Sequence, residues 1–315
     1  MVTTDLTALQ TPALLLDEAK MQRNIRRLAG RATALGVTLR PHLKTAKSID
    51  VARHLSGGTP GPVTVSTLAE AEAFHDAGYS DILYAVGISP SKLHRVMALR
   101  AKGCDLVVIL DGAEQATAAA SAGVPALIEI DSDGHRGGLL PNDLKLIDVG
   151  RILDARGVLR GVMTHAGESY NVTGHEAHAA FAERERAACV TAAGTLRAAG
   201  LDCQVVSVGS TPTALAARDL TGVTELRAGV YMFFDLVMAG IGVCGLDDLA
   251  LSVLTTVIGH QEAKGWILVD AGWMAMSRDR GTASQRVDQG YGMVCDVTGR
   301  PIPDLIVTAA NQEHG

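Results

Sequence analysis

The segment RPHLKTAKS, residues 40–48, places Lys44 directly after an apolar run and beside His42. A lysine that is held at the end of a strand and partly removed from water can titrate low enough to act as a nucleophile. A solvated lysine at the rim of a domain is the alternative, and Lys47 is expected to be solvated. Lys44 is therefore a candidate catalytic residue if other polar groups converge on it.

Polar residues and glycines follow several later apolar runs. They stand in the segments EIDSDGHRGG, THAGESY, GSTPT and ELRAGVY, at Arg136, His165, Tyr170, Gly209, Ser210, Thr211, Arg227, Gly229 and Tyr231. A glycine-rich turn such as GSTPT that opens a helix can bind phosphate through backbone N–H groups. The same letters also describe a plain helix N-cap followed by proline. Together with a lysine, a phosphate site favours pyridoxal phosphate, with Lys44 as its Schiff-base residue.

Eight short apolar runs alternate with alanine-rich helical stretches. The runs cover residues 37–44, 61–66, 81–86, 105–110, 126–131, 159–165, 203–209 and 225–231. Runs that are apolar throughout are typical of parallel strands buried on both faces. Eight strand–helix units predict a (β/α)8 barrel, whose active site lies at the carboxyl ends of the strands. An open doubly wound sheet is the alternative.

The pattern changes after about residue 237, where apolar and polar residues alternate between turn glycines. This pattern predicts an antiparallel β domain. The early run TPALLLD, residues 11–17, is expected to pair with that domain. We therefore predict a barrel over residues 18–237 and a β domain formed by residues 1–17 and 238–315.

Composition narrows the class of protein. The chain has 315 residues, a net charge of −6 and 3% aromatic residues, which argues against nucleic-acid binding. Its five cysteines form no CxxC pair and are expected to be free thiols. The N-terminus lacks the features of a signal peptide, and no apolar stretch is long enough to span a bilayer. A soluble cytoplasmic protein is expected.

The quoted segments, together with TPALLLDEAKMQRNIRRLAG, VDAGWMAMSRD and the final NQEHG, carry a resemblance over nearly the whole chain. The chain resembles the D-threonine aldolase and eukaryotic-type D-serine dehydratase family. These are fold-type III pyridoxal phosphate enzymes related to alanine racemase. The resemblance implies a barrel joined to a β domain, and a homodimer with its active site at the subunit interface.

The resemblance also implies roles for individual residues. It makes Lys44 the lysine that bonds the cofactor, Arg136 a contact of the cofactor's phenolic oxygen, and Arg227 the arginine that faces the pyridine nitrogen. His165 and Tyr170 would pack on the ring or face the substrate, with His165 as a candidate proton shuttle. The implied phosphate contacts and neighbouring cofactor-binding residues are Gly209, Ser210, Thr211, Gly229 and Tyr231.

The chain departs from the family pattern in two places. Ala46 stands where the family commonly has histidine in KTHK. The family also continues beyond EHG to a segment whose histidine and cysteine or aspartate hold a divalent metal. Mn, Mg or Zn is therefore expected from the family, but that ligand motif does not occur before Gly315. The expectation is either a shortened chain or a protein without this metal pair.

The predicted function is a lyase that acts on D-β-hydroxy-α-amino acids. Retro-aldol cleavage of a D-threonine-like substrate to glycine and an aldehyde is placed first, and D-serine dehydration to pyruvate and ammonia second. Racemization is third, because no second base is evident. The alternatives from other classes are a non-catalytic pyridoxal phosphate carrier and a barrel that binds another phosphate ligand.

Overall fold

The computed structural model describes residues 5–134 and 136–315. The chain forms two compact units, one of residues up to Asn24 together with Met232–Gly315, and one of Ile25–Tyr231. The boundaries drawn from the sequence, with a barrel over 18–237, stay predictions.

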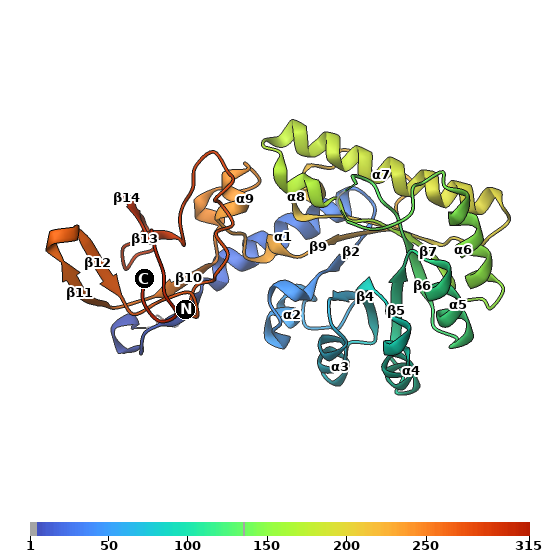
Figure 1. Ribbon diagram of the computed structural model, residues 1–315, viewed down its shortest axis with the longest axis horizontal. Coiled ribbons are helices and arrows are strands. Elements are labelled where there is room, and N and C mark those ends of the chain that lie inside the picture. Colours follow the sequence, from blue (N-terminus) through green and yellow to red (C-terminus); the bar gives the residue numbers. More distant parts are fainter. Residues whose placement is uncertain (1–4, 135) are drawn as a thin grey trace. The chain divides into compact units, whose positions relative to one another are not determined.

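Unit Ile25–Tyr231 contains a parallel sheet of eight strands in the order β2-β9-β8-β7-β6-β5-β4-β3 (Figure 1). Its strands are β2 (Thr38–Pro41), β3 (Val63–Val65), β4 (Asp81–Gly87), β5 (Asp105–Leu110), β6 (Ala126–Glu129), β7 (Leu159–Met163), β8 (Val205–Val208) and β9 (Glu225–Ala228). A parallel bridge between His42 and Thr64 connects the end of β2 to β3. The barrel prediction is confirmed, and each strand falls inside a run that the sequence identified, except that β4 extends one residue further, to Gly87.

Helices follow the strands and cover the outside of this sheet (Figure 1). The α-helices up to β9 are α1 (Glu18–Ala34), α2 (Ile49–Leu55), α3 (Leu68–Asp76), α4 (Leu93–Ala101), α5 (Ala113–Ser121), α6 (Leu144–Asp154), α7 (His175–Ala198) and α8 (Thr211–Ala216). Hydroxyl caps set several of the starts: Thr67 accepts a hydrogen bond from the N–H of Glu70 at 3.0 Å, and so begins α3. In the described part of the chain, no helix combines the length and the hydropathy needed to cross a membrane.

Short 3-10 turns lie at several junctions. They are η1 (Leu6–Ala8), η2 (Leu43–Thr45), η3 (Pro90–Lys92), η4 (Gly167–Asn171), η5 (Val230–Met232), η6 (Leu246–Asp248) and η7 (Glu262–Lys264). Three of these turns, η2, η4 and η5, follow barrel strands and carry residues of the predicted site.

Apolar side chains from the middle strands of the sheet pack together. Leu83, Ile109, Leu127 and Met163, from four consecutive strands, form one buried cluster. Each such side chain contributes about 1.5–3 kcal/mol when it leaves water. This packed centre fixes the strand ends on which the polar side chains stand.

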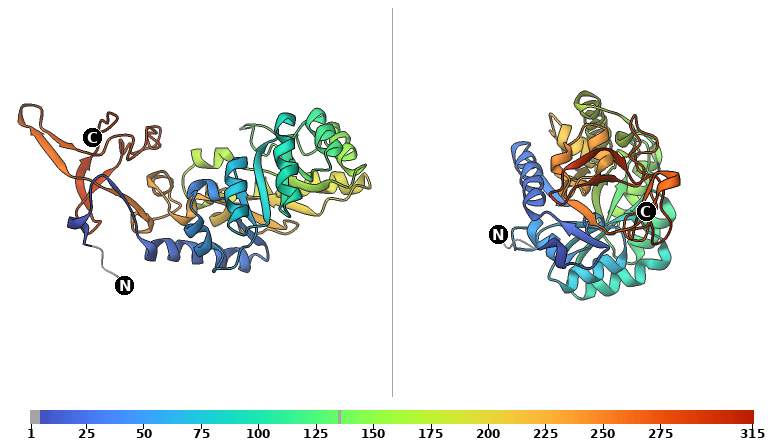
Figure 2. Two further views of the ribbon diagram at one scale, coloured as in Figure 1. Left: turned by 90° about the horizontal axis from the view of Figure 1, so that it is seen from below. Right: turned by 90° about the vertical axis from the view of Figure 1, so that its left-hand side faces the viewer.

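The other unit is built from antiparallel pairs, as the alternating sequence predicted. Its strands are β1 (Ala13–Leu16), β10 (Leu251–Leu254), β11 (Val257–Gln261), β12 (Trp266–Val269), β13 (Met293–Cys295) and β14 (Pro301–Ile306), and its helix is α9 (Leu236–Gly240). β1 pairs with β10, and Leu14 lies opposite Val253, so the predicted pairing of the early run is confirmed. β11 and β12 form the hairpin that is orange in Figure 2.

Candidate active site

The predicted site residues stand where barrel strands end. Lys44 lies in η2, directly after β2, and His165 follows β7. Gly209 and Ser210 join β8 to α8. The carboxyl ends of parallel strands meet on one rim of a barrel. The other predicted residues stand in or after β6, β7, β8 and β9: Arg136, Tyr170, Thr211, Arg227, Gly229 and Tyr231.

Arg227 ties three of these strands together. Its side chain is buried, and its two terminal nitrogens donate hydrogen bonds to the hydroxyl of Ser207 and the carbonyl oxygen of Thr164. Burial lowers the pKa of Arg227, and the negative charge of Glu225 opposes that shift. Both acceptors are neutral groups, and no carboxylate among the described residues bonds Arg227 directly.

His165 is held in one tautomer. Its Nδ1 donates a hydrogen bond to the carbonyl oxygen of Gly209 at 3.1 Å, which leaves Nε2 with a free lone pair. Burial lowers the pKa of His165 to about 4; the bond to Gly209 opposes this shift, and the charges of Arg227 and Lys44 add to it. Its ring lies 6.3 Å from that of Tyr170, centre to centre. His165 is therefore a neutral base at neutral pH.

Lys44 is activated by its surroundings. Part of the side chain is accessible to solvent, but burial of the rest lowers the pKa of the amine. The positive charges of Arg136 and Arg227 lower it further, and Glu70 opposes them. A lowered pKa enlarges the neutral, nucleophilic fraction of a lysine at neutral pH. This is the property that the sequence argument required of Lys44.

His42 is a second neutral histidine beside Lys44. Its Nδ1 accepts a hydrogen bond from the backbone N–H of Lys44 at 3.4 Å. Burial lowers the pKa of His42 well below its usual value, and the charges of Lys44 and Arg227 add to the effect. The sequence analysis placed His42 at the end of the first strand without giving it a task. Its position identifies it as a residue that shapes the Lys44 turn.

Arg136 already has a carboxylate partner. It is exposed, and its guanidinium lies 3.5 Å from the carboxylate of Glu129 at the end of β6. Burial raises the pKa of Glu129, and the charge of Arg136 opposes that shift. The pair keeps Arg136 on the rim and close enough for its charge to act on Lys44.

The GSTPT turn is a helix cap, which was one of the two interpretations of its sequence. The hydroxyl of Ser210 accepts from the N–H of Thr213 at 3.3 Å, and the hydroxyl of Thr213 accepts from the N–H of Ser210 at 3.0 Å. Gly209 has a φ of 136°, and a Cβ there would lie 2.0 Å from the carbonyl oxygen of Arg227. Only glycine allows the turn to approach β9 so closely.

Tyr231 supplies the observation that fits a phosphate group. Its side chain is fully buried, and its hydroxyl has no hydrogen-bond partner within residues 5–134 and 136–315. Its backbone N–H donates to the hydroxyl of Thr211 at 3.2 Å, which places it against the GSTPT turn. A buried hydroxyl without a partner costs about 1–3 kcal/mol, a cost that a ligand oxygen would remove. Lys44 and this hydroxyl together fit pyridoxal phosphate.

The metal expected from the family has no matching ligand set in this part of the chain. Among the described residues, no three side chains of His, Cys, Asp or Glu are grouped so that they could hold a metal ion.

Two known family models match this chain. The model of the alanine racemase N-terminal domain matches residues 16–237, and that of the putative serine dehydratase domain matches residues 250–315. The chain belongs to the alanine racemase N-terminal domain family. The resemblance drawn from the sequence is confirmed, and with it the membership among fold-type III pyridoxal phosphate proteins.

Individual relatives lie within the same family. D-threo-3-hydroxyaspartate dehydratase of Delftia sp. is 57% identical over 98% of this chain and 84% of its own. Its solved structure matches with a TM-score of 0.97 over 99% of this chain and 85% of that one. D-threonine aldolase from Filomicrobium marinum matches at 25% identity with a TM-score of 0.77, over 97% and 80%. D-serine dehydratase of Dictyostelium discoideum is 28% identical over 98% and 84%.

The sequence analysis assigned no role to the supporting residues of the site, although Thr164 stands in the strand-end segment THAGESY. Glu185, in the middle of α7, bonds the turns after β7 and β8, and Thr164 supplies an acceptor for Arg227. A glutamate on a long helix carries no local signal of such a role. The burial of this carboxylate and its contacts follow only from the way α7 packs against the sheet.

Proposed function

We propose that this chain is a pyridoxal-phosphate-dependent lyase that removes water from 3-hydroxy D-amino acids, with D-threo-3-hydroxyaspartate as its substrate. The 57% identity over 98% of the chain to the Delftia dehydratase carries this proposal. The lowered pKa of Lys44 and the unpaired hydroxyl of Tyr231 support it. Retro-aldol cleavage, placed first by the sequence analysis, becomes the second candidate.

In this proposal Lys44 would bond the cofactor, Tyr231 and the turn at Ser210 would hold its phosphate, and Arg227 would face its pyridine nitrogen. Bound pyridoxal phosphate supplies an electron sink for the electron pair left at the substrate's α-carbon. The amine of Lys44, free once the substrate's own amine has replaced it, would accept the α-proton and pass it to the departing hydroxyl group, which would leave as water. Dehydration of this substrate leaves an enamine, and its hydrolysis by one water molecule gives oxaloacetate and ammonia.

Retro-aldol cleavage is favoured by one feature of His165. Its Nε2 has a free lone pair that can accept a proton, and burial, which lowers its pKa to about 4, keeps the ring neutral at neutral pH but makes it a weak base. Cleavage between the α- and β-carbons begins when a base takes the proton of the β-hydroxyl. His165 would be that base, and the products from 3-hydroxyaspartate would be glycine and glyoxylate.

Turnover with product analysis tests both candidates. The purified chain is incubated with D-threo-3-hydroxyaspartate, pyridoxal phosphate and, in parallel, Mn, Mg or Zn salts. We expect oxaloacetate and ammonia as products. Formation of glycine and glyoxylate would instead show that the chain catalyses retro-aldol cleavage. D-serine and D-threonine serve as comparison substrates for the other activities of the family.

The Lys44→Ala variant is the matched control. The wild-type chain should show the visible absorption band of a lysine-bound cofactor, and the variant should lose both the band and turnover. A band without turnover of any of these substrates would indicate a non-catalytic carrier. No band in the wild type would contradict the cofactor assignment. The homodimer is proposed on the same family grounds, and light scattering gives its mass.

A further inference from the structure

Glu185 is a buried carboxylate on the outer layer of the barrel. It lies in the middle of α7, and 2% of it is exposed to solvent. Burial raises its pKa, and its hydrogen bonds and the charge of Arg227 oppose that shift. Burial of a carboxylate is unfavourable unless its oxygens are well bonded. An apolar side chain would pack at this position at lower cost.

Both oxygens of Glu185 are used at the cofactor side of the barrel. Oε1 accepts hydrogen bonds from the backbone N–H of Ala166 at 3.1 Å and of Gly209 at 2.9 Å. Oε2 accepts from the hydroxyl of Thr213 at 2.8 Å. Ala166 follows His165 at the end of β7, whereas Gly209 and Thr213 belong to the turn after β8. One carboxylate therefore fixes two neighbouring strand ends to the same helix.

These hydrogen bonds determine which donors of the turn are still available to bind a ligand. The N–H of Gly209 is occupied by Glu185, and that of Ser210 donates to the hydroxyl of Thr213. The carbonyl oxygen of Gly209 is thereby turned toward His165 and accepts a hydrogen bond from its Nδ1. The hydroxyl of Tyr231 stays without a partner in the described structure. The conformation of the turn thus depends on an acceptor that lies outside it.

We propose that Glu185 is a positioning residue that holds the turn at residues 209–213 in the conformation that accepts the cofactor's phosphate. The inference rests on the pyridoxal phosphate site proposed above. It adds a residue that contacts neither cofactor nor substrate. Removal of the Glu185 carboxylate should therefore weaken binding of the phosphate group rather than of the pyridine ring.

The test compares two probes that differ only in the phosphate. The purified apo chain is titrated with pyridoxal 5′-phosphate and with pyridoxal, and binding is followed by absorbance. Glu185→Ala should bind pyridoxal phosphate at least about 10-fold more weakly, a change that corresponds to about 1.4 kcal/mol. Its affinity for pyridoxal should stay within about twofold, because two of the three groups that Glu185 accepts from, Gly209 and Thr213, belong to the turn, and only Ala166 stands beside His165.

Two further variants complete the design. Glu185→Gln keeps an oxygen for the N–H groups of Ala166 and Gly209, and should show a smaller, phosphate-specific loss; it decides the question if Glu185→Ala does not fold. Glu183→Ala is the control, because Glu183 is on the same helix but half-exposed and paired with Arg186. It should bind both probes as the wild type does.

The outcomes separate this inference from the proposed function. Equal weakening of both probes in the Glu185 variants would mark a general structural role and overturn the inference, as would unchanged binding of both. If the wild type binds pyridoxal phosphate no better than pyridoxal, the phosphate site itself is wrong. If the wild type prefers pyridoxal phosphate and only the Glu185 variants lose that preference, the result supports both the phosphate site and the positioning role of Glu185.

Discussion

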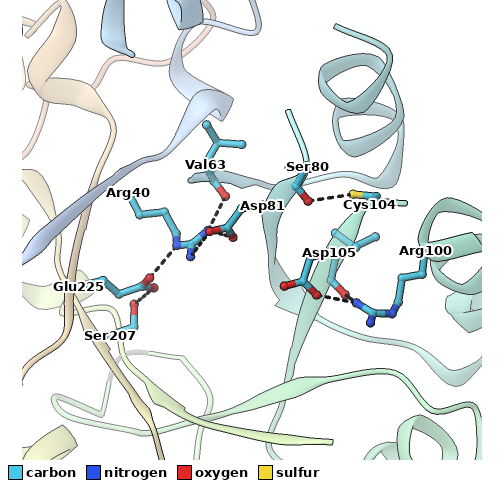
Figure 3. Close-up of polar contacts among 10 residues, drawn as sticks. Arg40, Val63, Ser80, Asp81, Arg100, Cys104, Asp105, Ser207 and Glu225 are labelled. Atoms are coloured by element: carbon cyan, nitrogen blue, oxygen red, sulfur yellow. Dashed lines mark hydrogen bonds and ion pairs between the residues drawn. The ribbon is translucent and has the colours of Figure 1, made fainter. Parts of the chain in front are cut away.

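Arg40 and Arg227 lie opposite each other in register on β2 and β9, yet their side chains bond different kinds of acceptor. Arg40 bonds the carboxylates of Asp81 and Glu225, each at 2.7 Å (Figure 3). Those partners are the first residues of their strands. Arg227 bonds the hydroxyl of Ser207 and the carbonyl oxygen of Thr164, and Ser207 in turn donates to Glu225 (Figure 3). Among the described residues, Arg40 therefore bonds two carboxylates directly, whereas Arg227 reaches one only through a hydroxyl.

The same contrast extends to the neighbouring charges. At the amino ends of the strands, Arg100 also pairs with Asp105, the first residue of β5, at 2.9 Å (Figure 3). Burial opposes the charge of Arg40, but the carboxylates of Glu225 and Asp81 raise its pKa. At the carboxyl ends, the pKa values of Lys44 and His165 are lowered. Paired charges stabilise one end, whereas poorly compensated positive charge makes the other end reactive.

The largest expected effect separates the two arginines. Arg40→Met should lower the free energy of unfolding by about 3 kcal/mol, because it leaves Glu225 buried without its cation. Cofactor affinity and turnover per folded molecule should be retained. Arg227→Met should instead abolish cofactor-dependent activity. Urea denaturation and cofactor titration of both variants measure the contrast, and a loss of activity without loss of stability in Arg40→Met would contradict it.

The next effect concerns pH. His165 titrates near 4 when folded and near 6.5 when unfolded, since burial and the charges of Arg227, Lys44 and Arg136 disfavour its cation. Between these values the unfolded chain binds more protons, so stability rises with pH and is lost as pH falls from 6.5 toward 4. The contribution is about 2–3 kcal/mol between pH 7 and 4.5.

Denaturant unfolding of the wild type and His165→Asn at both pH values isolates this contribution. The asparagine variant should lose less stability on acidification than the wild type does. The same pH dependence in both proteins would remove His165 from the group of perturbed residues at the carboxyl ends.

The smallest expected effect is that of Tyr231→Phe. The substitution removes a buried hydroxyl that has no partner, so the free energy of unfolding of the apo chain should stay level or rise by about 1 kcal/mol. Cofactor affinity should nevertheless fall by about tenfold, because the phosphate loses a donor. Thermal unfolding of the apo chain and a cofactor titration provide the two readouts. Destabilisation of the apo chain with unchanged cofactor affinity would show that the hydroxyl serves the fold.

Much of this architecture could be predicted from the sequence because its signals are local. Each barrel strand is an apolar run followed by a helical stretch, and burial on both faces requires that pattern. The alternation after residue 237 predicted antiparallel pairs, and the early run indeed pairs as β1 with β10. Lys44, His165 and the GSTPT turn were found because chemistry at strand ends has a fixed place in such barrels.

The sequence by itself determined the order of strands and helices, the strand-end position of Lys44 and the glycine at residue 209. Only the tertiary structure decided what these residues experience. The lowered pKa of Lys44 depends on Arg136 and Arg227, which are distant in sequence. The Glu185 contacts join a helix to two turns, 19 and 24 residues away along the chain. Such effects depend on distances through space, which no local pattern of residues encodes.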